Sequence, residues 1–284
     1  MNLNTSRVCS LPSYPGVDGR GPVALTYLED QQVLAACGSF EKDDQSCYLL
    51  SPDQPLSWQP LAAGDMSSWH CPDPRYTRNH FLKENGWFLV GQSDHCGDDI
   101  NAAGVSTELL NPQLQWTQPT ISSPYRGGYP ANTCSVAINS TTVIITGGYN
   151  ADNILSSTWM LDLTDYSWTQ LQDMPGYRYA HGCTTTATGE LIIAGGYGLS
   201  LSSVFIYNLI DNTWSQASDL PAGWDYYNPL MFLWNKQIII LERYSSNIWI
   251  LEEASWKKME ATMGATLNGY SDTAITVPTS TFTC

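Results

Sequence analysis

Histidine, cysteine and aspartate gather in one stretch of the chain, where side chains of these types could bind a metal ion. The stretch between residues 70 and 99 contains His70, Cys71, His80, Asp94, His95, Cys96, Asp98 and Asp99. Their spacings match no metal-ligand pattern, and the chain has no C-x-x-C pair. A Ser-His-Asp set, a G-x-S-x-G elbow and a phosphate-binding loop are absent from the sequence as well. We therefore expect no catalysis, no cofactor and no metal site.

Arginine and aromatic residues occupy a second kind of position, in the segments between runs of apolar residues. Five of the seven Arg lie in such segments. Arg and Tyr make good binding hot spots because they combine planar donors with rigid apolar area. The predicted ligand-binding residues are Arg20, Arg75, Arg78, Arg126, Arg178, Tyr129, Tyr179, Trp224, Tyr227 and Tyr270.

Internal repeats predict the elements that position these residues. Residues 134–175 and 181–221 each contain a short strand, an apolar strand that ends in Gly-Gly-Tyr, a third strand, a polar turn and then Trp. Gly147 and Gly195 are 48 residues apart, and Trp168 and Trp214 are 46 apart. A period in the high forties with four strands per unit is typical of a β-propeller blade. We therefore predict an all-β fold of four-stranded antiparallel blades.

Weaker copies of the same unit extend the repeat in both directions. Further Trp markers at Trp58, Trp116 and Trp256 bring the number of units to five, and the two ends of the chain supply strands for a sixth. A blade closed by both termini leaves no unpaired sheet edge. The prediction is a single propeller domain of six blades, at about 17–62, 76–121, 130–175, 177–221, 225–260, and 268–284 plus 1–12.

The two clearest units resemble the kelch-repeat family. The resemblance is carried by Gly147-Gly148-Tyr149 followed by Trp168, and by Gly195-Gly196-Tyr197 followed by Trp214. It implies that the double glycine ends the second strand and that Trp packs between neighbouring blades. It also implies that His181 is structural, and that an Arg before the first strand either ties loops together or contacts a ligand. The other three units keep one glycine or none, which leaves their strand limits less well defined.

The propeller prediction brings the Arg and aromatic residues to one face. Connections from the last strand of one blade to the first of the next all emerge around one end of the central channel, so they would form a locally basic, aromatic rim. Such a rim would suit an acidic peptide or an anionic glycan. In kelch-type substrate adaptors the corresponding face binds acidic peptides, and the resemblance implies the same use here.

The eight cysteines permit four disulfides. Cys37 and Cys47 flank a hairpin-like connection, where the distance between their Cα atoms suits a bridge. Terminal blade closure predicts a bridge between Cys9 and Cys284, worth ~4–5 kcal/mol in the chain-entropy model. Cys71 and Cys96 are placed to meet at one end of the second blade. Cys134 and Cys183 occupy equivalent first strands of adjacent blades, where they are either paired or two buried thiols.

Disulfides indicate an oxidising compartment, and two acceptor sequons agree with secretion. The sequons begin at Asn4 and Asn139. The first ten residues have no apolar region, so either there is no secretory signal or the numbering begins after its removal. We predict a secreted or extracellular glycoprotein, with a cytoplasmic location as the alternative.

Composition narrows the range of partners. The chain is 43% hydrophobic and 12% aromatic, and its net charge of −15 would repel nucleic acids and anionic membranes at long range. No apolar run is long enough to span a bilayer. The prediction is a non-enzymatic module that binds a protein or an acidic peptide through the rim. A structural or assembly subunit, such as an actin-bundling kelch protein, and a carbohydrate-binding or sugar-active propeller are the alternatives.

Overall fold

The structure of the chain is a computed structural model. The residues it describes are 11–15, 24–28, 32–38, 45–52, 55–61, 77–82, 86–92, 105–111, 113–125, 129–150, 153–198, 201–222, 227–242 and 245–262. Side chains are not described for 77–82, 87–92, 105–106 and 261–262. The described residues form strands and their connections, and none of their segments is a helix that could span a membrane.

The strands make five antiparallel sheets of four strands each, together with one two-stranded pair. The first sheet contains β1 (Ala24–Leu28), β2 (Val33–Cys37), β3 (Cys47–Leu50) and β4 (Trp58–Pro60). The second contains β5 (Thr77–Leu82), β6 (Gly86–Gln92), β7 (Val105–Leu110) and β8 (Trp116–Thr117). The third contains β9 (Cys134–Ala137), β10 (Thr142–Thr146), β11 (Thr158–Asp162) and β12 (Ser167–Leu171).

The fourth and fifth sheets repeat this arrangement. The fourth contains β14 (Gly182–Thr185), β15 (Leu191–Ala194), β17 (Val204–Asn208) and β18 (Thr213–Gln216). The fifth contains β19 (Leu230–Trp234), β20 (Gln237–Leu241), β21 (Asn247–Glu252) and β22 (Ser255–Thr262), which runs past the limit of 260 predicted for that blade. The additional pair joins β13 (Arg178–Tyr179) to β16 (Tyr197–Gly198).

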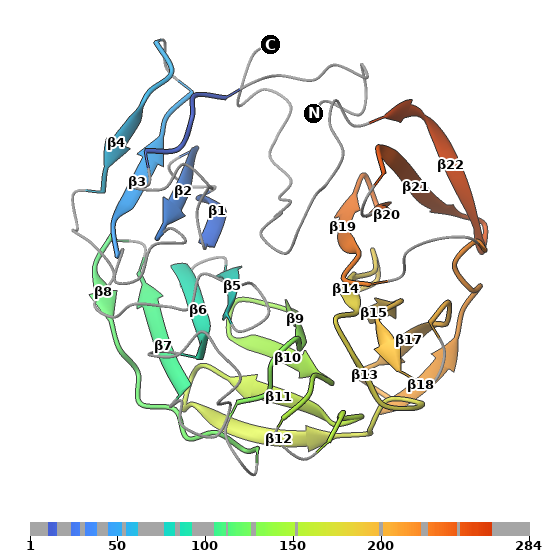
Figure 1. The fold of residues 1–284 in the computed structure, drawn as a ribbon. Coiled ribbons are helices and arrows are strands. Elements are labelled where there is room, and N and C mark those ends of the chain that lie inside the picture. Colours follow the sequence, from blue (N-terminus) through green and yellow to red (C-terminus); the bar gives the residue numbers. More distant parts are fainter. Residues whose placement is uncertain are drawn as a thin grey trace.

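The five sheets follow one another around a common centre, with the first strand of each sheet innermost (Figure 1). Contacts between consecutive sheets join β1 to β5, β5 to β9, β9 to β14 and β14 to β19. The predicted propeller of antiparallel four-stranded sheets is therefore confirmed. The sixth blade falls on residues that are almost all outside the described part of the chain, and it stays a prediction.

The spaces between consecutive sheets are filled by apolar side chains. Second strands such as Val143–Ile145 and Ile238–Ile240 are buried on both faces, which explains why their sequences are continuous apolar runs. Ile144 packs with Ile193 and Tyr207 of the next sheet. The first and fifth sheets each have one face with no described sheet next to it. These two faces are buried as well, at Tyr27, Leu34, Leu50, Ile239, Ile248 and Ile250. Burial at these two faces is what a sixth blade between them would produce.

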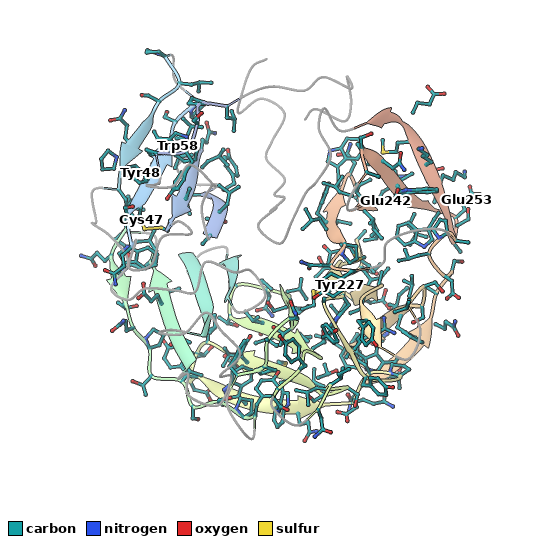
Figure 2. The ribbon with its side chains drawn as sticks, viewed as in Figure 1. Cys47, Tyr48, Trp58, Tyr227, Glu242 and Glu253 are labelled. Atoms are coloured by element: carbon teal, nitrogen blue, oxygen red, sulfur yellow. A yellow bond between two sulfur atoms is a disulfide. The ribbon has the colours of Figure 1, made fainter. Side chains whose placement is uncertain are left out.

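Tryptophans of the outermost strands bind the first, fourth and fifth sheets to the segment that precedes each of them. Trp214 Nε1 donates to the carbonyl of Gln172 at 2.9 Å, and Trp256 Nε1 donates to that of Ser218 at 3.0 Å. Both acceptors follow the outer strand of the preceding sheet. Trp58, on the first sheet in Figure 2, donates to the carbonyl of Pro12 at 3.0 Å. Pro12 therefore has the place that the exit of a preceding blade would have.

Two disulfides add covalent links to this architecture. Cys37 and Cys47 join the end of β2 to the start of β3. Cys134 and Cys183 join β9 to β14 and so link the innermost strands of adjacent sheets, with their Cα atoms 6.0 Å apart. Both pairings agree with the predicted positions, and the second resolves the choice between a bridge and two thiols. The other four cysteines, Cys9, Cys71, Cys96 and Cys284, lie outside the described residues.

Candidate functional site

The candidate site lies at one end of the propeller, which we call the tyrosine end. Antiparallel order places the connections from second to third strands at the same end as those from fourth to first strands of the next sheet. The Gly147–Tyr149 and Gly195–Tyr197 segments both begin such connections. The β13–β16 pair also lies there, because it joins one connection of each kind.

Four tyrosines from four different connections pack together at the tyrosine end. Tyr179 is at the centre, with its ring centroid 5.1 Å from that of Tyr149, 5.2 Å from that of Tyr197 and 6.1 Å from that of Tyr227. Tyr179 and Tyr197 are also direct partners in the register of β13 and β16. Figure 2 shows Tyr227 on the inner side of the ring of sheets. We call these four residues the tyrosine cluster.

Glycine pairs make this cluster possible. Gly147 and Gly148 have φ angles of 57° and 93°, a region that residues with a Cβ rarely adopt. A Cβ on Gly147 would lie 2.4 Å from the carbonyl oxygen of Arg178. Gly148 instead donates its N–H to that same oxygen at 2.9 Å, and Tyr149 pairs with Ala131 through two backbone hydrogen bonds. The double glycine thus turns the chain tightly enough to place Tyr149 beside Tyr179.

The cluster is open to solvent on part of its surface. Tyr197 is 53% exposed and the nearby Tyr177 is 44% exposed. Leu201, on the connection that follows Tyr197, is 45% exposed. Tyr149, Tyr179 and Tyr227 are half-buried. Exposed apolar side chains that lie together on a soluble protein typically mark a surface for interaction.

Arg178 does not contribute to this open surface, which corrects the prediction that it is a rim residue. Its side chain is only 3% exposed and donates to Gly195 O at 3.1 Å, Ser203 O at 3.3 Å and Ser203 Oγ at 2.7 Å. Burial lowers its pKa to about 10, so the guanidinium stays charged at neutral pH. Arg178 clamps the connection between the second and third strands of its own sheet.

Tyr129 is also buried, contrary to the prediction that it lines the rim. It is 1% exposed and belongs to the core between the second and third sheets, together with Tyr125. The two ring centroids are 5.8 Å apart, and burial raises the pKa of Tyr125 well above its ordinary value. The two tyrosines are therefore part of the core, and the apolar environment there disfavours the phenolate form of Tyr125.

His181 is structural, as the resemblance implied, and it joins two sheets. It is buried, and its Nε2 lies 2.8 Å from Thr146 Oγ1 at the end of β10. The donor in this pair depends on the histidine tautomer. The contact connects the residue before β14 to the preceding sheet, directly beneath the glycine turn.

Several other predicted site residues lie wholly or partly outside the described part of the chain. Arg20, Arg75, Arg126, Trp224 and Tyr270 lie outside the described residues, as does the sequon at Asn4. Arg78 is in β5 opposite Val90, with only its backbone described. Within the described part of the chain, His, Cys, Asp and Glu form no group suited to a metal ion.

By sequence, the connections that begin and finish at the tyrosine end contain more acidic than basic residues, which argues against the predicted locally basic rim. The nine connections between β2 and β21 that begin and finish at this end carry, by sequence, thirteen Asp and Glu against five Lys and Arg. One of the five is the buried Arg178. Among described side chains, Asp173 and Asp219 are exposed here and Glu242 (Figure 2) accepts from Asn247 and Trp249.

The predicted rim residues did not include Tyr149 and Tyr197, two members of the tyrosine cluster. Tyr149 and Tyr197 entered the sequence argument only as repeat markers. Their place directly after a double glycine was the available signal, because the strand that ends there must end at the same face as the Arg-Tyr connections. Tyr179 and Tyr227, which were predicted, do lie together with them.

Asn139 lies at the opposite end of the propeller, in the turn between β9 and β10. Its side chain is exposed, and Oδ1 accepts from the backbone N–H of Thr141 at 2.8 Å and from Thr141 Oγ1 at 3.2 Å. A glycan at this position would be remote from the tyrosine cluster.

Comparison with known proteins supports the fold and the repeat. Residues 130–175 and 178–221 match the kelch motif. The solved structure of YjhT superposes with a TM-score of 0.64 at 13% sequence identity, covering 89% of this chain and 86% of that one. At this identity the likeness concerns the fold alone. No curated protein matches the sequence.

Proposed function

We propose that this kelch-repeat β-propeller is a non-enzymatic binding module that recognises a protein or peptide at its tyrosine end. The observation that carries the proposal is the tyrosine cluster, in which four connections each contribute one ring to a surface that is open to solvent. Tyrosine is enriched in binding hot spots because its ring is rigid and its hydroxyl can form a hydrogen bond.

The surrounding structure supports such a role because it fixes the rings before a ligand arrives. The β13–β16 pair, the glycine turns and the Arg178 clamp all hold the connections that carry the tyrosines. A preorganised surface loses less conformational entropy on binding. Binding residues are commonly found on loops that a rigid scaffold positions.

The compartment we propose is extracellular or secretory. The support is the pair of disulfides, Cys37–Cys47 and Cys134–Cys183, since such bridges persist in oxidising surroundings. The remaining two bridges, Cys71–Cys96 and Cys9–Cys284, and glycosylation at Asn4 and Asn139 remain proposals of the same kind.

Affinity capture with matched variants tests the binding role. The bait proteins are the unchanged chain, Tyr197→Ser at the tyrosine end, and Ile210→Ser at the opposite end. Ile210 is a suitable control because it is 93% exposed in the turn between β17 and β18. A true partner is captured by the unchanged chain and by Ile210→Ser, and is lost or strongly reduced with Tyr197→Ser. Equal capture of all partners by the three folded baits would refute the proposal.

A further inference from the structure

The positions of the charged side chains around the tyrosine cluster bear on the kind of ligand that it could bind. Four positively charged side chains are described in the structure: Arg178, Lys236, Lys257 and Lys258. Lys236 lies in the turn between β19 and β20, and Lys257 and Lys258 lie near the start of β22, so all three are toward the opposite end. The one cation described at the tyrosine end is the buried Arg178.

Arg178 cannot serve an anionic ligand without being released from its clamp. Its guanidinium donates to two backbone carbonyls and one hydroxyl, and its Cζ lies 5.3 Å from the centroid of the Phe205 ring. Withdrawing it would leave buried acceptors unpaired. An acidic ligand on the tyrosine cluster would thus meet tyrosine rings, and no described cation would be available to it.

The same surface suits a ligand of the opposite charge. Tyrosine rings attract Arg and Lys side chains through their π electrons, and a guanidinium also stacks on an aromatic face. The acidic connections would add long-range attraction, since the whole chain has a net charge of −15. Both the short-range contact with the rings and the long-range electrostatic attraction therefore favour a cationic ligand.

We infer that the tyrosine cluster binds an exposed Arg or Lys side chain of a partner protein. The inference deepens the proposed binding function, on which it rests, and replaces the acidic peptide with a basic one. Tyr197 and Tyr179 are the residues expected to contact the cationic group, and Asp173 and Asp219 are expected to contribute to its attraction.

Peptide titration separates cation recognition from general electrostatic attraction. The probes are three labelled peptides of the form Gly-X-Gly-X-Gly, in which X is arginine, citrulline or glutamate; citrulline has nearly the shape of arginine without its charge. We expect the arginine peptide to bind about tenfold more tightly than the citrulline peptide, and the glutamate peptide to bind least.

Variants of Tyr197 then identify the rings as the origin of the preference. Tyr197→Phe retains the aromatic face and is expected to retain the arginine preference, whereas Tyr197→Leu is expected to lose most of it. Neither changes the charge of the chain, and Ile210→Ser serves as the remote control. Thermal unfolding confirms that each variant is folded. Equal binding of arginine and citrulline peptides, or an arginine preference that Tyr197→Leu leaves intact, would overturn the inference.

The two proposals fail in different ways. If captured partners survive Tyr197→Ser, the binding role of the tyrosine end is wrong. If partners are lost with Tyr197→Ser but their affinity is unchanged when the Arg and Lys of the bound segment are replaced by citrulline and acetyl-lysine, the end binds a partner and only the cation inference is wrong.

Discussion

Replacing Arg178 distinguishes a structural clamp from a ligand contact. The side chain makes three hydrogen bonds, to Gly195 O, Ser203 O and Ser203 Oγ, at a site that is 3% exposed. A hydrogen bond that involves a charged group contributes roughly 1.5–3 kcal/mol, although water entering the vacated space would satisfy some of the acceptors. We therefore expect Arg178→Ala to lower the free energy of unfolding by about 3–4 kcal/mol.

Lysine and methionine at the same position sharpen this prediction. Arg178→Lys keeps the charge but cannot reach all three acceptors with a planar fork, so we expect about half the loss. Arg178→Met fills much of the volume without any donor and should resemble alanine in stability. Urea unfolding followed by tryptophan fluorescence measures all three. An alanine variant within about 0.5 kcal/mol of the unchanged chain, combined with loss of ligand binding, would show that Arg178 is a binding residue and refute this reasoning.

Three further predictions concern the disulfide, the buried tyrosine and the sequon. Replacing both Cys134 and Cys183 with Ser opens a loop with a sequence separation of 49, so the free energy of unfolding should fall by about 4 kcal/mol in the chain-entropy model; an unchanged urea midpoint would contradict the bridge. Burial raises the pKa of Tyr125, so the fold keeps the phenol neutral while the unfolded chain ionises near pH 10. Stability should therefore be unaffected by this group below pH 10 and should fall as the pH rises above it, and Tyr125→Phe should reduce that fall in unfolding experiments at pH 9 to 11. Asn139→Gln should lower the mass of the secreted protein by one N-glycan without weakening partner binding, because Asn139 lies at the opposite end; equal masses would exclude a glycan there.

Much of the fold could be predicted because the repeat spacing has a direct physical cause. A Trp lies on the outer strand of every sheet, and Trp214 and Trp256 each donate a hydrogen bond to the connection before their sheet. A second strand between two packed sheets must be apolar on both faces, which makes runs such as Val143–Ile145 easy to find. The outer-strand Trp and the apolar second strand recur once per sheet, so the sequence shows a regular repeat.

The site was harder to predict because residue type does not determine side-chain direction. Arg178 and Tyr179 are neighbours in β13, and their side chains therefore point to opposite faces of that strand. Arg178 turns into the protein and Tyr179 turns toward the cluster. Which face is open depends on the pairing of β13 with β16, two segments that no spacing rule brings together.

The sign of the charge was misjudged for a related reason. The connections between blades from β4 to β19 contain five Asp beside their three Arg, and the connections between second and third strands, which finish at the same end, contain further Asp and Glu. The segment 93–104 alone carries three Asp and no Lys or Arg. Strand polarity places both kinds of connection together, so their charges must be added.

Site-specific crosslinking tests the central claim most directly. A photoreactive benzoylphenylalanine is introduced in place of Tyr197 in one protein and in place of Ile210 in another, and each is irradiated with the captured partner. The account predicts a covalent adduct from position 197 and none from position 210. An adduct from position 210 alone, with position 197 unreactive in a folded protein, would contradict it.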